Sequence, residues 1–143
     1  MKINDVIHAK PNQSVVTISP DATVRQLIAL LAEHNVGALV VSEDGERVAG
    51  IVSERDVVRR LHADEAVLDS PVSRIMTSQV RTCAGDDGLT DLMQTMTEHR
   101  IRHVPVVADG RLSGIISIGD VVKSRIGELE FERDQLDSYV HQT

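Results

Sequence analysis

The sequence predicts an α+β fold of two βαββα repeats, packed sheet to sheet about a pseudo-two-fold axis and followed by a C-terminal helix. The first observation is a duplication, because "GIVSERDVVRRL" at 50–61 returns as "GIISIGDVVKSR" at 114–125. The second is that the flanking residues 17–61 and 82–125 stay in register with one deletion near Glu46. One half is too small to bury its own sheet well, so pairing of two halves explains the duplication physically.

Each repeat is expected to begin with a short β segment followed by a helix. The β segments are "SVVTI" and "QVRTC", and the helices cover 22–34 and 87–99. Apolar residues in both helices follow the i, i+3, i+4, i+7 spacing that places them on one helical face. These residues are Val24, Leu27, Ile28 and Leu31 in the first helix and Leu89, Leu92, Met93 and Met96 in the second.

Each repeat then continues as a hairpin and a closing helix. The strands are "VGALVVS" and "VAGIVS" in one half and "IRHVPVV" and "LSGIIS" in the other. Their turns, "EDGER" and "ADGR", place Gly45 and Gly110 where a positive φ is favoured. Closing helices are expected over 54–62 and 118–126, and short helices "INDVI" and "VSRIM" precede the two repeats. The resulting division is 1–66 for repeat one, 67–126 for repeat two and 127–143 for an amphipathic C-terminal helix.

Composition and charge exclude several function classes. The 143 residues carry 15 Lys and Arg against 22 Asp and Glu, a net charge of −7, which argues against nucleic acid and anionic membranes as partners. Cys83 is the single cysteine, so neither an internal disulfide nor a Cys-pair metal site is expected. The absence of a long apolar run predicts a cytoplasmic protein. Basic residues do gather in "HRIRH" at 99–103, which keeps a small anion as a plausible partner.

Neither catalysis nor metal binding is expected. No nucleophile, base and orienting group stand out together, and the "GxSxG" elbow of serine hydrolases is missing. The two histidines of "HRIRH" have a helical metal-ligand spacing, but this segment passes from helix to strand and no cysteine or acid completes a set. We therefore predict no enzyme activity, no catalytic cofactor and no metal.

A serine and an aspartate three residues apart begin each closing helix: Ser53 with Asp56, and Ser117 with Asp120. One interpretation is a capping box, in which the side chains satisfy free N–H groups of the first helical turn. The other is a nucleotide site. A helix N-terminus favours phosphate, and a carboxylate can accept both hydroxyls of a ribose. The residues alone leave both interpretations open.

The duplicated "GIVSERDVV" and "GIISIGDVV", the strand "RHVPVV" and the lead-in "VSRIMT" resemble a tandem pair of CBS domains, a family named after cystathionine β-synthase. The resemblance covers residues 2–125. It implies a stand-alone regulatory protein, or Bateman module, that binds AMP, ADP, ATP, NAD(H) or S-adenosylmethionine between its repeats. Such a protein would act as a homodimer and report energy or redox state to a downstream protein target. The alternative is a structural module with an empty cleft, used for dimerisation or docking.

The resemblance also implies the site residues. In the family motif the aspartate holds the ribose, the Ser/Thr region meets phosphate, the first-strand threonine lines the base pocket, and the residues before the middle-strand proline reach the phosphates. The main site is then expected to comprise Thr82, Arg102, His103, Pro105, Ser117, Gly119 and Asp120, with Arg55 reaching across from repeat one.

A second site would comprise Thr17, Gly37, Ala38, Ser53 and Asp56. Repeat one lacks the basic pair and the proline of repeat two. The second site is therefore expected to be empty, weaker or used by the second half of a dinucleotide.

The C-terminal segment carries apolar residues near one face of a continued helix. This helix either packs on its own chain or docks on a second copy, and the resemblance favours the second copy. The apolar residues are Ile126, Leu129, Leu136, Tyr139 and Val140.

Overall fold

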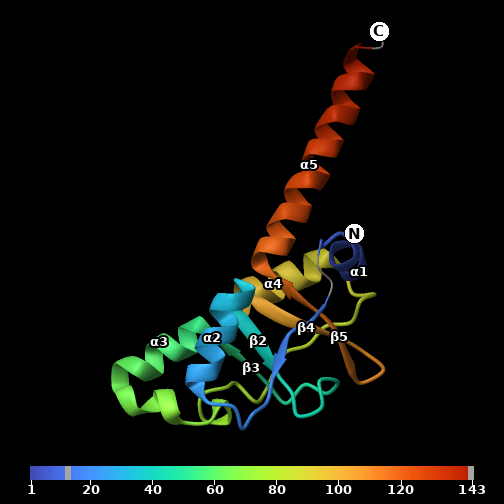
Figure 1. The fold of residues 1–143 in the computed structure, drawn as a ribbon. Coiled ribbons are helices and arrows are strands. Elements are labelled where there is room, and N and C mark those ends of the chain that lie inside the picture. Colours follow the sequence, from blue (N-terminus) through green and yellow to red (C-terminus); the bar gives the residue numbers. More distant parts are fainter. Residues whose placement is uncertain (12–13, 142–143) are drawn as a thin grey trace.

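The computed structural model describes residues 1–11 and 14–141, and it confirms the predicted α+β class with two related halves and a C-terminal helix (Figure 1). Helices α2 and α3 flank the strands of the first half, and α1, α4 and the start of α5 lie with those of the second. The elements are α1 (Ile3–His8), β1 (Thr17–Ile18), α2 (Val24–His34), β2 (Ala38–Val41), β3 (Gly50–Ser53), α3 (Glu54–Ala63), short 3-10 turns at Glu65–Asp69 and Val72–Arg74, α4 (Leu89–His99), β4 (His103–Ala108), β5 (Arg111–Ser117) and α5 (Ile118–His141).

The first half contains a three-stranded sheet in the order β1-β2-β3. Strand β1 pairs in parallel with β2, and β2 pairs antiparallel with β3, as the predicted β-α-β step and hairpin require. Every residue of β2 is buried, which follows from its continuous apolar sequence. Gly45 and Gly110 adopt φ of 78° and 76°, so both predicted turns are confirmed.

The predicted strand "QVRTC" is wrong. In the second half only Cys83 pairs, through an isolated parallel bridge to Val106, and the sheet consists of β4 and β5 alone. The N–H of Cys83 donates to the carbonyl of Pro105 at 3.0 Å, and the N–H of Val107 donates back to Cys83 at 2.9 Å. The residues just before Cys83 are largely exposed, so they have no apolar face to hold against the sheet.

The two lead-in segments exchange places between the halves. Ile3, Val6 and Ile7 of α1 belong to the hydrophobic core of repeat two. Val72 and Ile75, which precede repeat two in the chain, belong to the core of repeat one. Each core is therefore completed by the segment that leads into the other repeat, and core membership crosses the sequence boundary expected near residue 66.

This exchange also satisfies the first free N–H group of a helix in each half. Val24 opens α2 and donates to the carbonyl of Ser70 at 3.0 Å. Leu89 opens α4 and donates to the carbonyl of Met1 at 3.0 Å. Since the first turn of a helix has no internal acceptors for its N–H groups, these contacts anchor each helix to the exchanged segment.

The expected closing helix and C-terminal helix of repeat two form one continuous helix, α5, which projects from the body (Figure 1). Its 24 residues correspond to about 36 Å. Val121 is buried, whereas the Leu136 and Tyr139 side chains are 66% and 74% exposed, so the tail does not pack on its own chain. None of the described helices, α5 included, has the apolar length that crossing a membrane requires.

Gly50 lies at the seam between the halves, which is the contact between β3 and the exchanged segment around Met76 and Thr77. A Cβ atom there would lie 2.6 Å from Met76 Sδ and 2.9 Å from the backbone oxygen of Thr77, which bonds the N–H of Ile51 at 3.0 Å. The methionine side chain can move, but the Thr77 oxygen cannot move without breaking its hydrogen bond with Ile51. We expect Gly50→Ala to lose about 1–3 kcal/mol of unfolding free energy in urea titrations.

Gly127→Ala is the matched control. A Cβ at this helical position meets no atom within 4 Å, so the substitution should be neutral or gain up to about 1 kcal/mol. A Gly50→Ala protein as stable as the wild type would contradict the close packing of the exchanged segment.

Candidate ligand-binding site

Both Ser-x-x-Asp pairs form capping boxes. The Ser53 hydroxyl accepts from the N–H of Asp56 at 3.4 Å, and Asp56 Oδ2 accepts from the N–H of Ser53 at 2.9 Å. At Ser117 and Asp120 the corresponding distances are 3.1 and 2.9 Å. The capping interpretation is confirmed, but it uses only one carboxylate oxygen. Within the described residues, Oδ1 of Asp56 accepts no hydrogen bond, so it can still receive one from a ligand.

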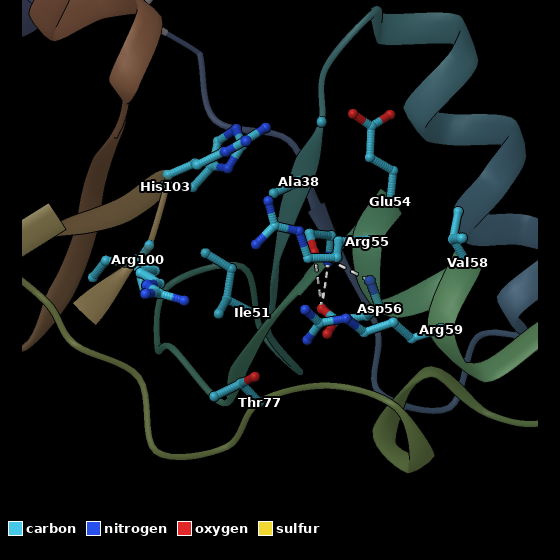
Figure 2. Close-up of a pocket in the computed structure, with 14 residues that line it drawn as sticks. Ala38, Ile51, Glu54, Arg55, Asp56, Val58, Arg59, Thr77, Arg100 and His103 are labelled. Atoms are coloured by element: carbon cyan, nitrogen blue, oxygen red, sulfur yellow. Dashed lines mark hydrogen bonds between the residues drawn. The ribbon is translucent and has the colours of Figure 1, made fainter. Parts of the chain in front are cut away.

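A cavity of about 620 Å³ opens beside Asp56, at the corner where strand β3 passes into helix α3 (Figure 2). This volume lies within the range of small-molecule sites. Both repeats and the segment that joins them contribute to its lining, which comprises Gly37, Ala38, Ile51, Ser53, Glu54, Arg55, Asp56, Val58, Arg59, Thr77, Arg100, Ile101, Arg102 and His103.

Equivalent backbone bonds hold the two strand-to-helix corners. The N–H of Glu54 at the start of α3 donates to the carbonyl of Gly37 at 3.0 Å, and the N–H of Ile118 at the start of α5 donates to that of Arg102 at 2.8 Å. A Cβ at Gly37 would lie 3.4 Å from both Glu54 Oε1 and His103 Cε1. A glycine at this point therefore lets side chains of the two repeats approach closely.

Four arginines give the cavity an excess of positive charge. Arg55 and Arg59 extend from α3, whereas Arg100 and Arg102 come from repeat two. Figure 2 shows Arg100 on the opposite side of the cavity from Arg55 and Arg59. Two acids line the same cavity, yet none of the four guanidinium groups makes a hydrogen bond or ion pair within 1–11 and 14–141. Unpaired arginines in a chain of net charge −7 indicate a site for an anion, and guanidinium geometry suits phosphate.

Seven residues that line the cavity were not predicted as site residues, namely Ile51, Glu54, Val58, Arg59, Thr77, Arg100 and Ile101. Arg59 had a usable signal, because it lies four residues after Arg55 and so on the same face of the helix. Arg100 is placed by the left-handed end of α4, with φ of 54°, where repeat one has Asn35 with φ of 51°. Its direction could not be inferred from the residue pattern.

His103 lies between the two corners and is half-buried. Burial lowers its pKa below the ordinary value, and this outweighs the nearby Asp120 and Glu54 carboxylates, which favour the charged ring. His103 is therefore largely neutral at pH 7 and available as an uncharged hydrogen-bonding group.

The Asp120 corner is occupied by the chain's own lysine. Lys10 Nζ lies 3.1 Å from Asp120 Oδ2 and donates to the carbonyl of Ile115 at 3.0 Å. Both side chains of the pair are three-quarters buried, at 25% and 22% exposed. Burial pushes the pKa of Asp120 upward, but hydrogen bonds from Ser117 and Lys10 hold it below the ordinary value. Across the described part of the chain, Asp56 makes no ion pair of this kind.

The structure therefore revises the expected grouping of site residues. It joins Arg55, Arg102 and His103, expected in the main site, to four residues of the second site, namely Gly37, Ala38, Ser53 and Asp56. The start of β4 shares the cavity with the α3 corner rather than with the α5 corner that follows it in the chain. The remaining predicted residues do not line the cavity: Thr17, Thr82, Pro105, Ser117, Gly119 and Asp120.

Three of these residues have clear structural positions instead. Thr17 pairs with Val40 in the first sheet, Thr82 is exposed, and Pro105 is buried in β4.

In the part of the chain that the structure describes, no cluster of His, Cys, Asp and Glu is arranged to hold a metal ion.

A CBS domain model matches residues 3–63 and 72–127, so the chain belongs to the CBS domain family. It is 36% identical over 146 residues to the mitochondrial CBS domain-containing protein CBSX3 of Arabidopsis thaliana, covering 96% of this chain and 71% of that one. A CBS-domain protein from Burkholderia ambifaria superposes with a TM-score of 0.83 at 40% identity, over 89% and 95% of the two chains. The CBS pair of protein MJ0100, in complex with 5'-methylthioadenosine and S-adenosyl-L-methionine, superposes at 0.76 with 25% identity, over 90% and 98%.

The position of His103 predicts a pH-dependent stability. Its folded-state pKa is lowered from 6.5, so below that pH the unfolded chain takes up the proton first. Stability is then fully present above 6.5 and declines as pH falls, by at most about 1.4 kcal/mol per pH unit. The unfolding free energies of wild type and His103→Gln should be measured from pH 7.5 to 5. The wild type should lose stability relative to the variant as the pH falls, because glutamine does not titrate in this range. Parallel curves would contradict a depressed pKa.

Proposed function

We propose that this chain is a regulatory module that binds an adenine nucleotide in the Asp56 cavity. The observation that carries the proposal is the combination of an available carboxylate oxygen with four unpaired arginines around one cavity built by both repeats. The adenosine-based ligands of the related MJ0100 pair support the same ligand class.

Each part of a nucleotide has a suitable partner in this cavity. Asp56 Oδ1 would accept from the ribose hydroxyls, since a carboxylate oxygen has two lone pairs. The arginines would bind the phosphate through charge-assisted hydrogen bonds. Ala38, Ile51 and Val58 supply apolar surface for the base (Figure 2). The neutral ring of His103 adds a donor or acceptor without adding charge.

Binding would regulate by linking the two repeats. Arg55 and Arg59 belong to one half and Arg100 and Arg102 to the other, so an anion between them stabilises one relative arrangement of the halves. The resulting shift cannot exceed the difference in ligand affinity between the two arrangements. A homodimer formed through the exposed face of α5, and a downstream protein that detects the shift, complete the proposal. We place this module in the cytoplasm and assign it no catalytic step.

A purely structural module is the competing function, and the confirmed capping boxes favour it, because they account for both Ser-x-x-Asp pairs without a ligand. Thermal melts distinguish the two. A ligand at a hundredfold excess over its Kd stabilises the folded state by about 2.7 kcal/mol. A scaffold with an empty cleft shows no shift with AMP, ADP, ATP, NADH or S-adenosylmethionine.

Asp56→Asn and Asp120→Asn form a matched pair, because both remove a capping carboxylate and only the first changes the cavity. Losing a hydrogen bond to a charged group costs about 1.5–3 kcal/mol, so Asp56→Asn should weaken nucleotide binding about 10- to 150-fold in titration calorimetry. Asp120→Asn should bind like wild type. Equal losses in both variants would mean that the effect comes from the caps.

Lys10→Met tests why one corner is available and the other is not. With Lys10 present, calorimetry should give one nucleotide per chain, because the Lys10 ammonium already neutralises the Asp120 carboxylate. Its removal leaves the carboxylate without this counter-charge, but Asp120 does not line the cavity with the four arginines, so we expect a second nucleotide to bind at least about tenfold more weakly than the first. A stoichiometry of two in wild type would show that Lys10 does not block this corner.

A further inference from the structure

The backbone of His103 belongs to the α5 corner, whereas its side chain lines the cavity at the α3 corner (Figure 2). In the ladder between β4 and β5 it pairs with Ser117, whose N–H donates to Asp120 Oδ2 at 2.9 Å. Its ring approaches Gly37 of repeat one, where a Cβ atom would lie 3.4 Å from His103 Cε1 and 3.6 Å from its Nε2. His103 therefore connects the nucleotide cavity to the corner that Lys10 occupies.

Burial and the charges of four surrounding segments set the protonation of this ring. Burial has the largest effect and lowers the pKa of His103. The carboxylates of Asp120 in α5 and Glu54 in α3 oppose this effect, whereas the charges of Arg102 before β4 and Lys10 after α1 add to it. Within the described residues, neither ring nitrogen makes a hydrogen bond or ion pair. The ring can therefore gain a proton without losing an existing partner.

We infer that His103 takes up a proton when a phosphate-bearing ligand enters the cavity, so that the site prefers phosphorylated over uncharged ligands more strongly as the pH falls. This inference rests on the proposed function, and it concerns the regulation of that same site. One proton moves from solvent to a ring nitrogen, and no bond within the ligand forms or breaks. His103 is then a specificity-determining residue whose effect depends on pH.

The charge of the ligand decides whether the proton is taken up. In the empty cavity the Arg102 charge disfavours an imidazolium, whereas a bound phosphate offsets that charge and attracts the protonated ring. An imidazolium also donates from both ring nitrogens, and the neutral ring donates from one. Because the phosphate then raises the pKa of the ring, linkage requires that the protonated ring binds the phosphate more tightly. Uptake of one proton increases affinity by at most about tenfold per pH unit.

The difference between the repeats supplies a single ring of this kind. Ala38 is the counterpart of His103 in repeat one, since it pairs with Ser53 as His103 pairs with Ser117. Both residues line the cavity, and among its described lining residues His103 is the sole histidine. A proton taken up on binding is therefore assigned to this side chain.

Titration calorimetry with AMP and adenosine from pH 7.5 to 5.5 tests the inference on the full chain. The AMP affinity of wild type should rise by about threefold or more relative to that of His103→Gln as the pH falls. The comparison cancels the titration of the AMP phosphate, which itself takes up a proton at about pH 6. Adenosine carries no phosphate, so the ratio of its affinities for the two proteins should stay constant. His99→Gln, the same substitution at an exposed position at the end of α4 outside the cavity, should keep the wild-type pH dependence.

Proton NMR of the imidazole Cε1–H follows the ring directly, and its signal is assigned by its absence from His103→Gln. In wild type, AMP should raise the pKa of His103 and adenosine should leave it unchanged. Two variants at the other corner should act in opposite directions on the ligand-free protein. Lys10→Met removes a facing positive charge and should raise the pKa, whereas Asp120→Asn removes a facing carboxylate and should lower it. At pH 7.5, where the ring is largely neutral, Asp120→Asn should still bind AMP like wild type.

The outcomes separate this inference from the proposed function. If AMP binds but wild type and His103→Gln show the same pH dependence, or if AMP leaves the titration of the ring unchanged, the proton-uptake inference is overturned while the nucleotide site stands. The NMR readout uses the wild-type chain, so it decides the matter even where a variant folds poorly. If neither AMP nor adenosine binds, both the inference and the nucleotide site are overturned.

Discussion

The exchange of the two lead-in segments is the constraint on which the rest of the molecule depends. Ile3 and Ile7 complete the core of repeat two, while Val72 and Ile75 complete that of repeat one. Neither half can be removed without opening the core of the other. The backbone bridge between Ile51 and Thr77 continues this seam to the edge of the cavity, so the packing that stabilises the pair also shapes the site.

Pseudo-symmetry builds two equivalent corners, and electrostatics makes them different. The capping carboxylates of Asp56 and Asp120 have the same local geometry, with an Oδ2 to serine N–H distance of 2.9 Å in each. Lys10 neutralises Asp120, whereas Asp56 shares a cavity with four arginines that have no partner among the described residues. A duplicated fold thus carries one corner stabilised internally and one corner available to an anion.

Much of the architecture could be predicted because it is encoded locally. The periodic apolar faces of α2 and α4, the turns at Gly45 and Gly110, and the capping serines all depend on residues within one or two helical turns. The strand "QVRTC" failed because a strand also needs a partner and a buried face, and only Cys83 obtains them. The set of residues around the cavity differs from the expected grouping for a related reason, since it depends on how two distant corners oppose each other.

The sequence by itself determined the duplication, the α+β class, the helix caps and the residues that carry charge, because each follows from short-range spacing along the chain. Only the tertiary structure decided that Arg102 and His103 line the same cavity as Asp56, and that Lys10 reaches Asp120 across more than a hundred residues. These are contacts between segments far apart in the chain. Their geometry is set by core packing between the halves, which residue patterns do not specify.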